Sequence, residues 1–265
     1  SEMCIRDRSN VGEIENKGIE LSVGLQLVDT KDWNVRLNAS YNTNHNKVLS
    51  IGNAVPFAIG GFSSRTVQTV VAEGQPVGFI RGYKAVLNSD NSLKEILPLQ
   101  NLGSTLPTVY GNFSLSASYK NLSLMINGDY QYGAYVHSFD RQFRFSKGLK
   151  DSAIPEKALE GLDQGANWLN FTNFFVEKSD FVKIRNIGIS YDYKPEKYLK
   201  NINFGFNVYN PFAFTASSVD PEAALAGARS QGAVAVGGLN YSSYSTPRQY
   251  VGSVSYTHLR AHQTK

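Results

Sequence analysis

Strict alternation of apolar and polar residues is the strongest pattern along this chain. Between residues 19 and 27 the odd positions are apolar and the even positions are polar or small, and the alternation resumes from Trp33 to Asn42 after a short polar turn. Alternation with a period of two predicts β-strands that have one apolar and one polar face. The turn predicts that these two strands pair as an antiparallel hairpin.

The same pattern recurs further along the chain. It returns at 108–120, 122–132, 182–193, 202–208 and 250–256, which predicts about seven long strands in total. The pattern changes phase once, because Val182 and Ile184 are apolar at even positions whereas Ile187 and its successors are apolar at odd positions. A β-bulge near Arg185 and Asn186 would bring both halves onto one face.

The connections between these strands alternate in length. Those at 28–32, 120–121 and 194–201 are short, and those at 45–106, 133–180 and 211–246 are long. Outer-membrane barrels have short periplasmic turns and long external loops, whereas soluble folds rarely keep such long loops at one end. We therefore expect an all-β fold, an antiparallel transmembrane β-barrel. About seven strands are too few to close a barrel in lipid, so the barrel is expected to be partial.

Composition excludes several classes of protein. The chain has 15 Tyr and 15 Phe, more than a disordered protein would carry. Its net charge of +4 is too small for a dedicated nucleic-acid binder, so we expect no nucleic-acid partner. One cysteine excludes an intrachain disulfide framework and a cysteine-based zinc cluster.

The sequence contains none of the common catalytic motifs. The chain has no G-x-S-x-G turn, no phosphate-binding loop of the G-x-x-x-x-G-K-[ST] type and no H-E-x-x-H pair. We therefore expect no enzyme activity, no catalytic residue, no metal and no cofactor. The carboxylates Glu20, Asp129 and Asp192 lie on the polar faces of separate strands, where we expect channel water to hydrate them.

The long loops are the expected place for binding. Aromatic side chains there could stack on sugar rings or contact a partner protein. The alternative, that they pack the loops against themselves, stays open. The candidate substrate-binding residues are the loop aromatics Tyr83, Tyr135, Trp168, Phe171, Tyr241 and Tyr244. Around them, the loop 133–180 is expected to contain a short helix with Pro155 in its first turn.

Several short motifs follow one another in a fixed order. They are N-V-G-E-I-E-N-K-G-I-E-L at 10–21, G-Q-P-V-G-F at 74–79, Y-K-N-L-S-L at 119–124, F-V-K-I-R-N-I-G-I-S-Y at 181–191, N-V-Y-N-P-F at 207–212 and P-R-Q-Y at 247–250. In this order they resemble the SusC/RagA-type TonB-linked outer-membrane proteins of Bacteroidetes.

The resemblance implies a transporter of the outer membrane. Residues 10–254 would form the C-terminal part of a barrel of about 22 strands. Such a protein imports oligosaccharides or peptides, has a SusD-like surface lipoprotein as its lid, and contacts TonB through an N-terminal part outside this chain. Its outer face would lie in outer-membrane lipid. Residues 1–9 and 255–265 depart from the family pattern and are expected to be non-native tails.

A second hypothesis keeps the same strands but belongs to another class of protein. In a soluble β-sandwich carbohydrate-binding module, a second sheet would cover the apolar faces. Leu21, Val35, Phe113 and Ile126 would then lie between two sheets. In the barrel, the same side chains would face lipid.

Overall fold

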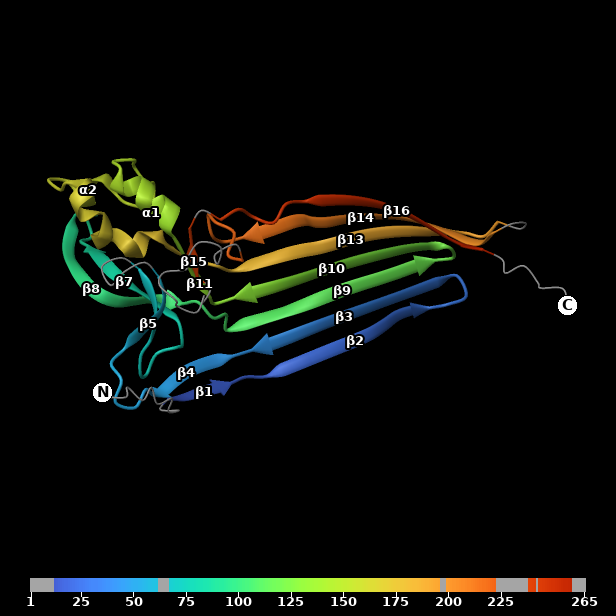
Figure 1. The fold of residues 1–265 in the computed structure, drawn as a ribbon, viewed down its shortest axis with the longest axis horizontal. Helices are drawn as coiled ribbons and strands as arrows, with labels where there is room; N and C mark the ends of the chain where they lie inside the picture. Colours follow the sequence, from blue (N-terminus) through green and yellow to red (C-terminus); the bar gives the residue numbers. More distant parts are fainter. Residues whose placement is uncertain (1–11, 62–66, 196–198, 223–237, 242, 259–265) are drawn as a thin grey trace, which may run out of the picture.

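The chain forms one long antiparallel sheet that carries smaller elements at one end (Figure 1). The computed structural model describes residues 12–61, 67–195, 199–222, 238–241 and 243–258. Seven strands make the long sheet, in the order β16-β14-β13-β10-β9-β3-β2. They are β2 (Glu20–Asp29), β3 (Trp33–Thr43), β9 (Val109–Tyr119), β10 (Leu122–Tyr132), β13 (Phe181–Tyr193), β14 (Leu199–Thr215) and β16 (Gln249–His258). The predicted set of long strands is confirmed.

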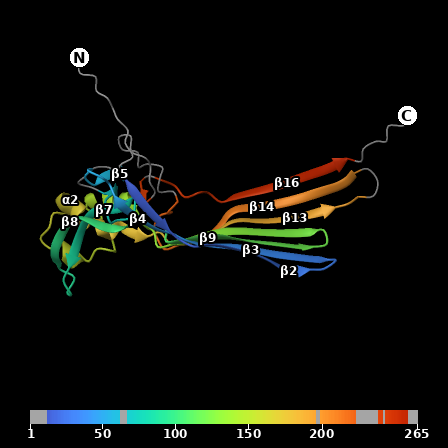
Figure 2. The ribbon, with the colours of Figure 1, turned by 90° about the horizontal axis from the view of Figure 1, so that it is seen from below.

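The apolar face of the long sheet is left uncovered by protein. Leu21 is 54% exposed and Phe206 is 47% exposed, and in Figure 2 the smaller elements gather at one end of the sheet, beyond its faces. Within the described part of the chain, no second sheet packs over Leu21, Val35, Phe113 or Ile126. The sandwich hypothesis is therefore wrong, and the fold is a partial antiparallel barrel wall.

The predicted bulge in β13 is confirmed. Against β10, Asn186 pairs with Asn127 and Ile184 pairs with Gly128, so Arg185 is the extra residue. The register against β14 shifts at the same place. The bulge lets the apolar positions on both sides of it share one face.

The long connections and the segment before β2 contain strands that the alternation did not predict. Three small sheets form there: β1 (Glu13–Lys17) with β4 (His45–Ser50); β5 (Phe57–Gly61), β6 (Gln68–Val71), β7 (Phe79–Leu87) and β8 (Leu93–Ser104); and β11 (Tyr135–Ser138) with β12 (Val176–Lys178) and β15 (Leu239–Asn240). The helices are α1 (Phe139–Ser146), η1 (Glu156–Leu159), α2 (Gln164–Asn167) and η2 (Trp168–Phe175). Pro155 directly precedes η1, at its N-cap. None of these helices is long and apolar enough to cross a membrane.

The buried core lies in these connections. We call the assembly of β5 to β8, β11, α1, η1, α2, η2, β12 and β15 the loop body. One cluster joins Ala85 of β7 to Phe145, Phe171 and Phe175. A second joins Ile80 and Phe139 to Leu239, so all three long connections contribute to the core.

The structure describes part of the C-terminal segment that the sequence pattern sets apart, but none of residues 1–9. Strand β16 continues to His258 and pairs there with Leu199 of β14, so residues 255–258 extend the sheet. Residues 1–11 and 259–265 lie outside the described residues. The expectation that 1–9 and 255–265 are non-native stays a prediction.

Candidate functional site

Four of the six predicted binding aromatics belong to or border the two core clusters of the loop body. Phe171 is fully buried, with 0% of its surface exposed. Trp168 is partly buried between the two clusters, and Tyr135 and Tyr241 border the second. The structure brings Trp168 and Tyr241 together around Phe139, with ring centroids 6.2 and 5.1 Å from it. In these four, much of the ring surface contacts protein, which leaves less of it for a ligand.

The other two candidates lie apart. Tyr83 is partly buried on β7. Tyr244 is 94% exposed, in the segment between β15 and β16. Among the six, Tyr244 therefore presents the largest exposed fraction. Its role in substrate binding stays a prediction.

A buried polar chain runs through the loop body. His137 Nε2 lies 2.6 Å from Gln142 Oε1, and Gln142 Nε2 donates to Thr172 Oγ1 at 2.9 Å. Burial lowers the pKa of His137 to about 4, with a further lowering from the charge of Arg141, while the hydrogen bond with Gln142 opposes the shift. The imidazole is therefore neutral at pH 7 and ties β11 to α1 and η2.

The polar face of the long sheet is hollowed. A cavity of about 380 Å³ lies on this face, and the described residues that line it carry no charge. Serine, asparagine and glycine dominate: the lining includes Asn34, Ser116, Ser118, Ser123, Gly188, Ser190, Asn203, Gly205, Asn207 and Ser253. The many hydroxyl and amide groups of this face can form hydrogen bonds with water. We call it the polar wall.

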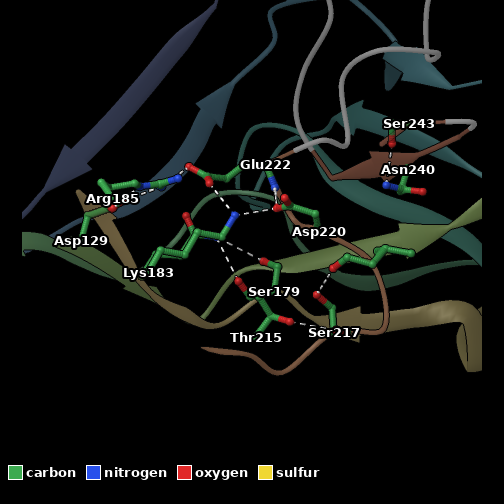
Figure 3. A network of polar contacts seen from close by, with 12 residues as sticks. Asp129, Ser179, Lys183, Arg185, Thr215, Ser217, Asp220, Glu222, Asn240 and Ser243 are labelled. Carbon is green, nitrogen blue, oxygen red and sulfur yellow. Dashed lines mark hydrogen bonds and ion pairs between the residues drawn. The ribbon is translucent and has the colours of Figure 1, made fainter. Parts of the chain in front are cut away.

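Five charged side chains gather where this wall meets the loop body (Figure 3). We call Asp129, Lys183, Arg185, Asp220 and Glu222 the ion cluster. Lys183 Nζ donates to Asp220 Oδ1 at 2.6 Å and to Glu222 Oε2 at 2.5 Å. Arg185 holds Asp129 through Nε and Nη2, and its Nη2 also donates to Glu222 Oε1 at 2.5 Å.

The acids of the ion cluster beyond β14 are held ionised. Burial alone would raise the pKa of Asp220 and of Glu222. Hydrogen bonds and positive charge from Lys183 and Arg185 outweigh burial, so both pKa values lie below their ordinary range. The side chain of Lys183 is 6% exposed, and a cation this buried needs such partners.

The ion cluster was not predicted from the sequence. Asp129 was expected to be hydrated, but its carboxylate is engaged by Arg185. One part of the ion cluster had a signal in the sequence, the phase change in β13. The extra residue at that phase change is Arg185, a cation, and β13 pairs with β10, the strand that carries Asp129. The contact of Asp220 and Glu222 with these cations could not be predicted, because both acids lie outside the alternating strands. Across the described ranges, the ion cluster included, no three His, Cys, Asp or Glu side chains come together as a metal site.

Comparison with known proteins places this geometry among outer-membrane receptors. No family model matches the chain. TonB-dependent receptors P3 and P26 of Formosa agariphila are 23% and 25% identical to it over 91% and 90% of its length. TonB-dependent receptor P39 of the same organism is 32% identical over 29% of the chain. The chain spans 28% of the length of P3 and of P26.

Solved structures share the fold. The structure of the RagAB peptide transporter superimposes with a TM-score of 0.66 at 20% identity, and covers 94% of this chain and 30% of its own. The RagAB peptide importer in its closed-closed state gives a TM-score of 0.67 at 20% identity, with the same coverage. Relatives and fold agree with the resemblance: the chain is similar in sequence to TonB-dependent receptors, shares its fold with the RagAB structures, and forms part of an antiparallel β-barrel wall of the outer membrane.

Proposed function

We propose that this chain forms part of the barrel wall and the external loops of a TonB-dependent transporter that imports oligosaccharides or peptides. A SusD-like surface lipoprotein serves as its lid, and TonB acts through a part of the receptor outside this chain. RagAB, whose fold the chain shares, is a peptide transporter, so peptides are the first cargo class to test.

The contrast between the two faces of the long sheet carries this proposal. One face exposes apolar side chains such as Leu25, Ile189 and Phe204, and the other is a hollow of hydroxyl and amide groups. A lipid bilayer on the apolar side leaves no energetic penalty for that exposure. The polar side then faces an aqueous passage, as in outer-membrane barrels.

Uptake by cells tests the proposal. The gene that encodes the complete receptor is deleted in its host, and uptake of labelled oligopeptides and oligosaccharides is compared before and after complementation. The proposal expects uptake of at least one cargo class to be lost, restored by complementation, and abolished again without TonB. Uptake of every cargo at the parental rate in the deletion strain would contradict it. Co-purification of a SusD-like lipoprotein with the tagged receptor tests the lid.

A further inference from the structure

Lys183 and Arg185 lie side by side on the polar face and bind carboxylates that come from outside the sheet. Both cations project from the bulged end of β13, and their charged ends lie over the ring of the buried Phe181, with Lys183 Nζ at 4.9 Å and Arg185 Cζ at 5.7 Å from its centroid. Asp220 and Glu222 follow the end of β14 and fold back to meet them (Figure 3). The bound groups are therefore a tethered pair of carboxylates.

The segment that carries this pair is fastened at few other points. We call residues 216–222 the stem. Ser217 Oγ donates to Val219 O at 2.6 Å within the stem, and Ser218 N donates to Glu177 Oε2 at 2.5 Å. Ser217 is buried, at 8% exposure. Release of the two carboxylates would leave the stem held at its start, where Ala216 N donates to Asp180 O at 2.9 Å, and at Ser218, which contacts Glu177 and Arg141.

Space for another ligand adjoins the two cations. A cavity of about 210 Å³ lies beside them, and its lining includes Lys183, Arg185, Ser217, Asp220, Ser245 and Thr246. Hydroxyl groups beside two cations suit a small anion with several oxygens, since charge-assisted hydrogen bonds are the stronger class. The cavity therefore offers an incoming carboxylate a place next to the groups that it would displace.

We propose that Lys183 and Arg185 form a carboxylate-binding site on the inner wall, and that Asp220 and Glu222 occupy it as an intramolecular ligand which the carboxylates of an acidic solute displace. The site thereby couples arrival of an acidic solute to release of the stem. This inference goes beyond the proposed transport, because it concerns binding alone and is measured without uptake.

The test compares binding of succinate and of its neutral diamide, succinamide, to the complete receptor in detergent. Isothermal titration calorimetry at about 20 mM salt keeps screening weak. The double variant D220N/E222Q removes the tethered carboxylates. The matched control D90N/E156Q makes the same two changes at exposed acids of the loop body that pair with Lys157 and Lys150.

We expect D220N/E222Q to bind succinate at least about tenfold more tightly than the parent. If Asp220 and Glu222 occupy the site nine-tenths of the time, only one-tenth of the molecules can bind succinate, and the apparent affinity of the parent falls about tenfold. D90N/E156Q should bind like the parent, succinamide should not bind, and addition of K183M to D220N/E222Q should remove the gain. A D220N/E222Q variant no tighter than its matched control, or a gain that survives K183M, would overturn the proposal.

A second measurement needs no change in the ion cluster. Ser217→Cys, in a complete receptor whose other cysteines are replaced by serine, reports release of the stem through the rate of labelling by a maleimide. The ion cluster is unchanged in this variant. Succinate should accelerate labelling at position 217, while succinamide and sodium chloride of equal ionic strength should not. Equal rates in all three solutions would also overturn the proposal, whatever the outcome of the uptake experiment.

Discussion

Arg185 of β13 binds Asp129 of the neighbouring β10 at two points, with 2.7 Å between Arg185 Nη2 and Asp129 Oδ2. The residue that makes this contact is the extra residue of the bulge. An irregularity in the strand pairing therefore supplies the cation that links β10 and β13 to the end of β14. Side chains at the bulge thus join the sheet to the stem.

Loss of this two-point contact should destabilise the barrel wall modestly. Asp129→Asn keeps the shape of the side chain but removes its charge. Both partners are about a third exposed, so we expect a loss of about 1 kcal/mol in the free energy of unfolding. Urea unfolding of the complete receptor in detergent measures it. Glu95→Gln, an exposed site on β8, is the control and should leave the value unchanged.

Gly111 of β9 is required by a tyrosine that crosses over it. Tyr130 pairs with Gly111 and donates its hydroxyl to Ser40 O at 2.9 Å, two strands away. A Cβ at Gly111 would lie 2.1 Å from Ser40 O and 2.6 Å from the Tyr130 hydroxyl. Gly111→Ala should therefore cost about 1–3 kcal/mol in the free energy of unfolding.

Gly252 of β16 provides the matched comparison for this variant. A Cβ there meets nothing within 4 Å, so Gly252→Ala should be tolerated in the same urea titration. If both variants lowered the free energy of unfolding by the same amount, the loss in Gly111→Ala would not come from a clash with Tyr130.

Phe171 and Tyr244 should separate packing from recognition. Phe171 is fully buried in the loop body, so Phe171→Ala should lower the stability of the loop body by about 3–5 kcal/mol. Tyr244→Ala should leave stability unchanged and weaken cargo binding, if the exposed ring contacts cargo. Hydrogen exchange of the loop body and cargo titration are the two measurements. A stable Phe171→Ala variant would contradict the packing described above.

Acid should loosen the loop body through His137. Its pKa in the folded protein is about 4 because it is buried, below about 6.5 in an unfolded chain. Folding therefore favours the neutral imidazole, and the stability that depends on it is fully present above pH 6.5. It is lost as the pH falls from 6.5 towards 4, at about 1.4 kcal/mol per pH unit.

Hydrogen exchange of β11, corrected for the intrinsic rate, measures this slope between pH 7 and pH 5. His137→Gln should flatten it. His45→Gln, at an exposed residue of β4, should keep it. A slope unchanged by His137→Gln would assign the acid sensitivity to other groups.

The long sheet was predictable because its information is local. Alternation fixes which face each residue occupies, and the phase change between Ile184 and Ile187 is sufficient to locate the bulge. Each inference used residues next to one another in the chain. The same reasoning, with the lengths of the connections, led to a partial barrel wall.

The loop body was not predictable, since its contacts join distant residues. Asn173 donates to Ala85 O at 3.3 Å and accepts from Ala85 N at 2.9 Å, across 88 positions in the chain. No periodic pattern records such a pair. For Phe171, the sequence analysis left both packing and recognition open, and the structure places its ring in the core.

A spin-label measurement at two adjacent residues of β13 tests the central claim most directly. Both residues border the hollow, but alternation along the strand places the side chain of Ile189, which is 45% exposed, on the apolar face and that of Ser190 on the polar face. Nitroxides at Ile189→Cys and Ser190→Cys, in a complete receptor whose other cysteines are replaced by serine and which is embedded in bilayers, are exposed to oxygen and to a water-soluble nickel chelate. We predict that oxygen dominates relaxation at 189 and the chelate at 190. Access of the chelate to 189 equal to that at 190 would contradict a lipid-facing wall.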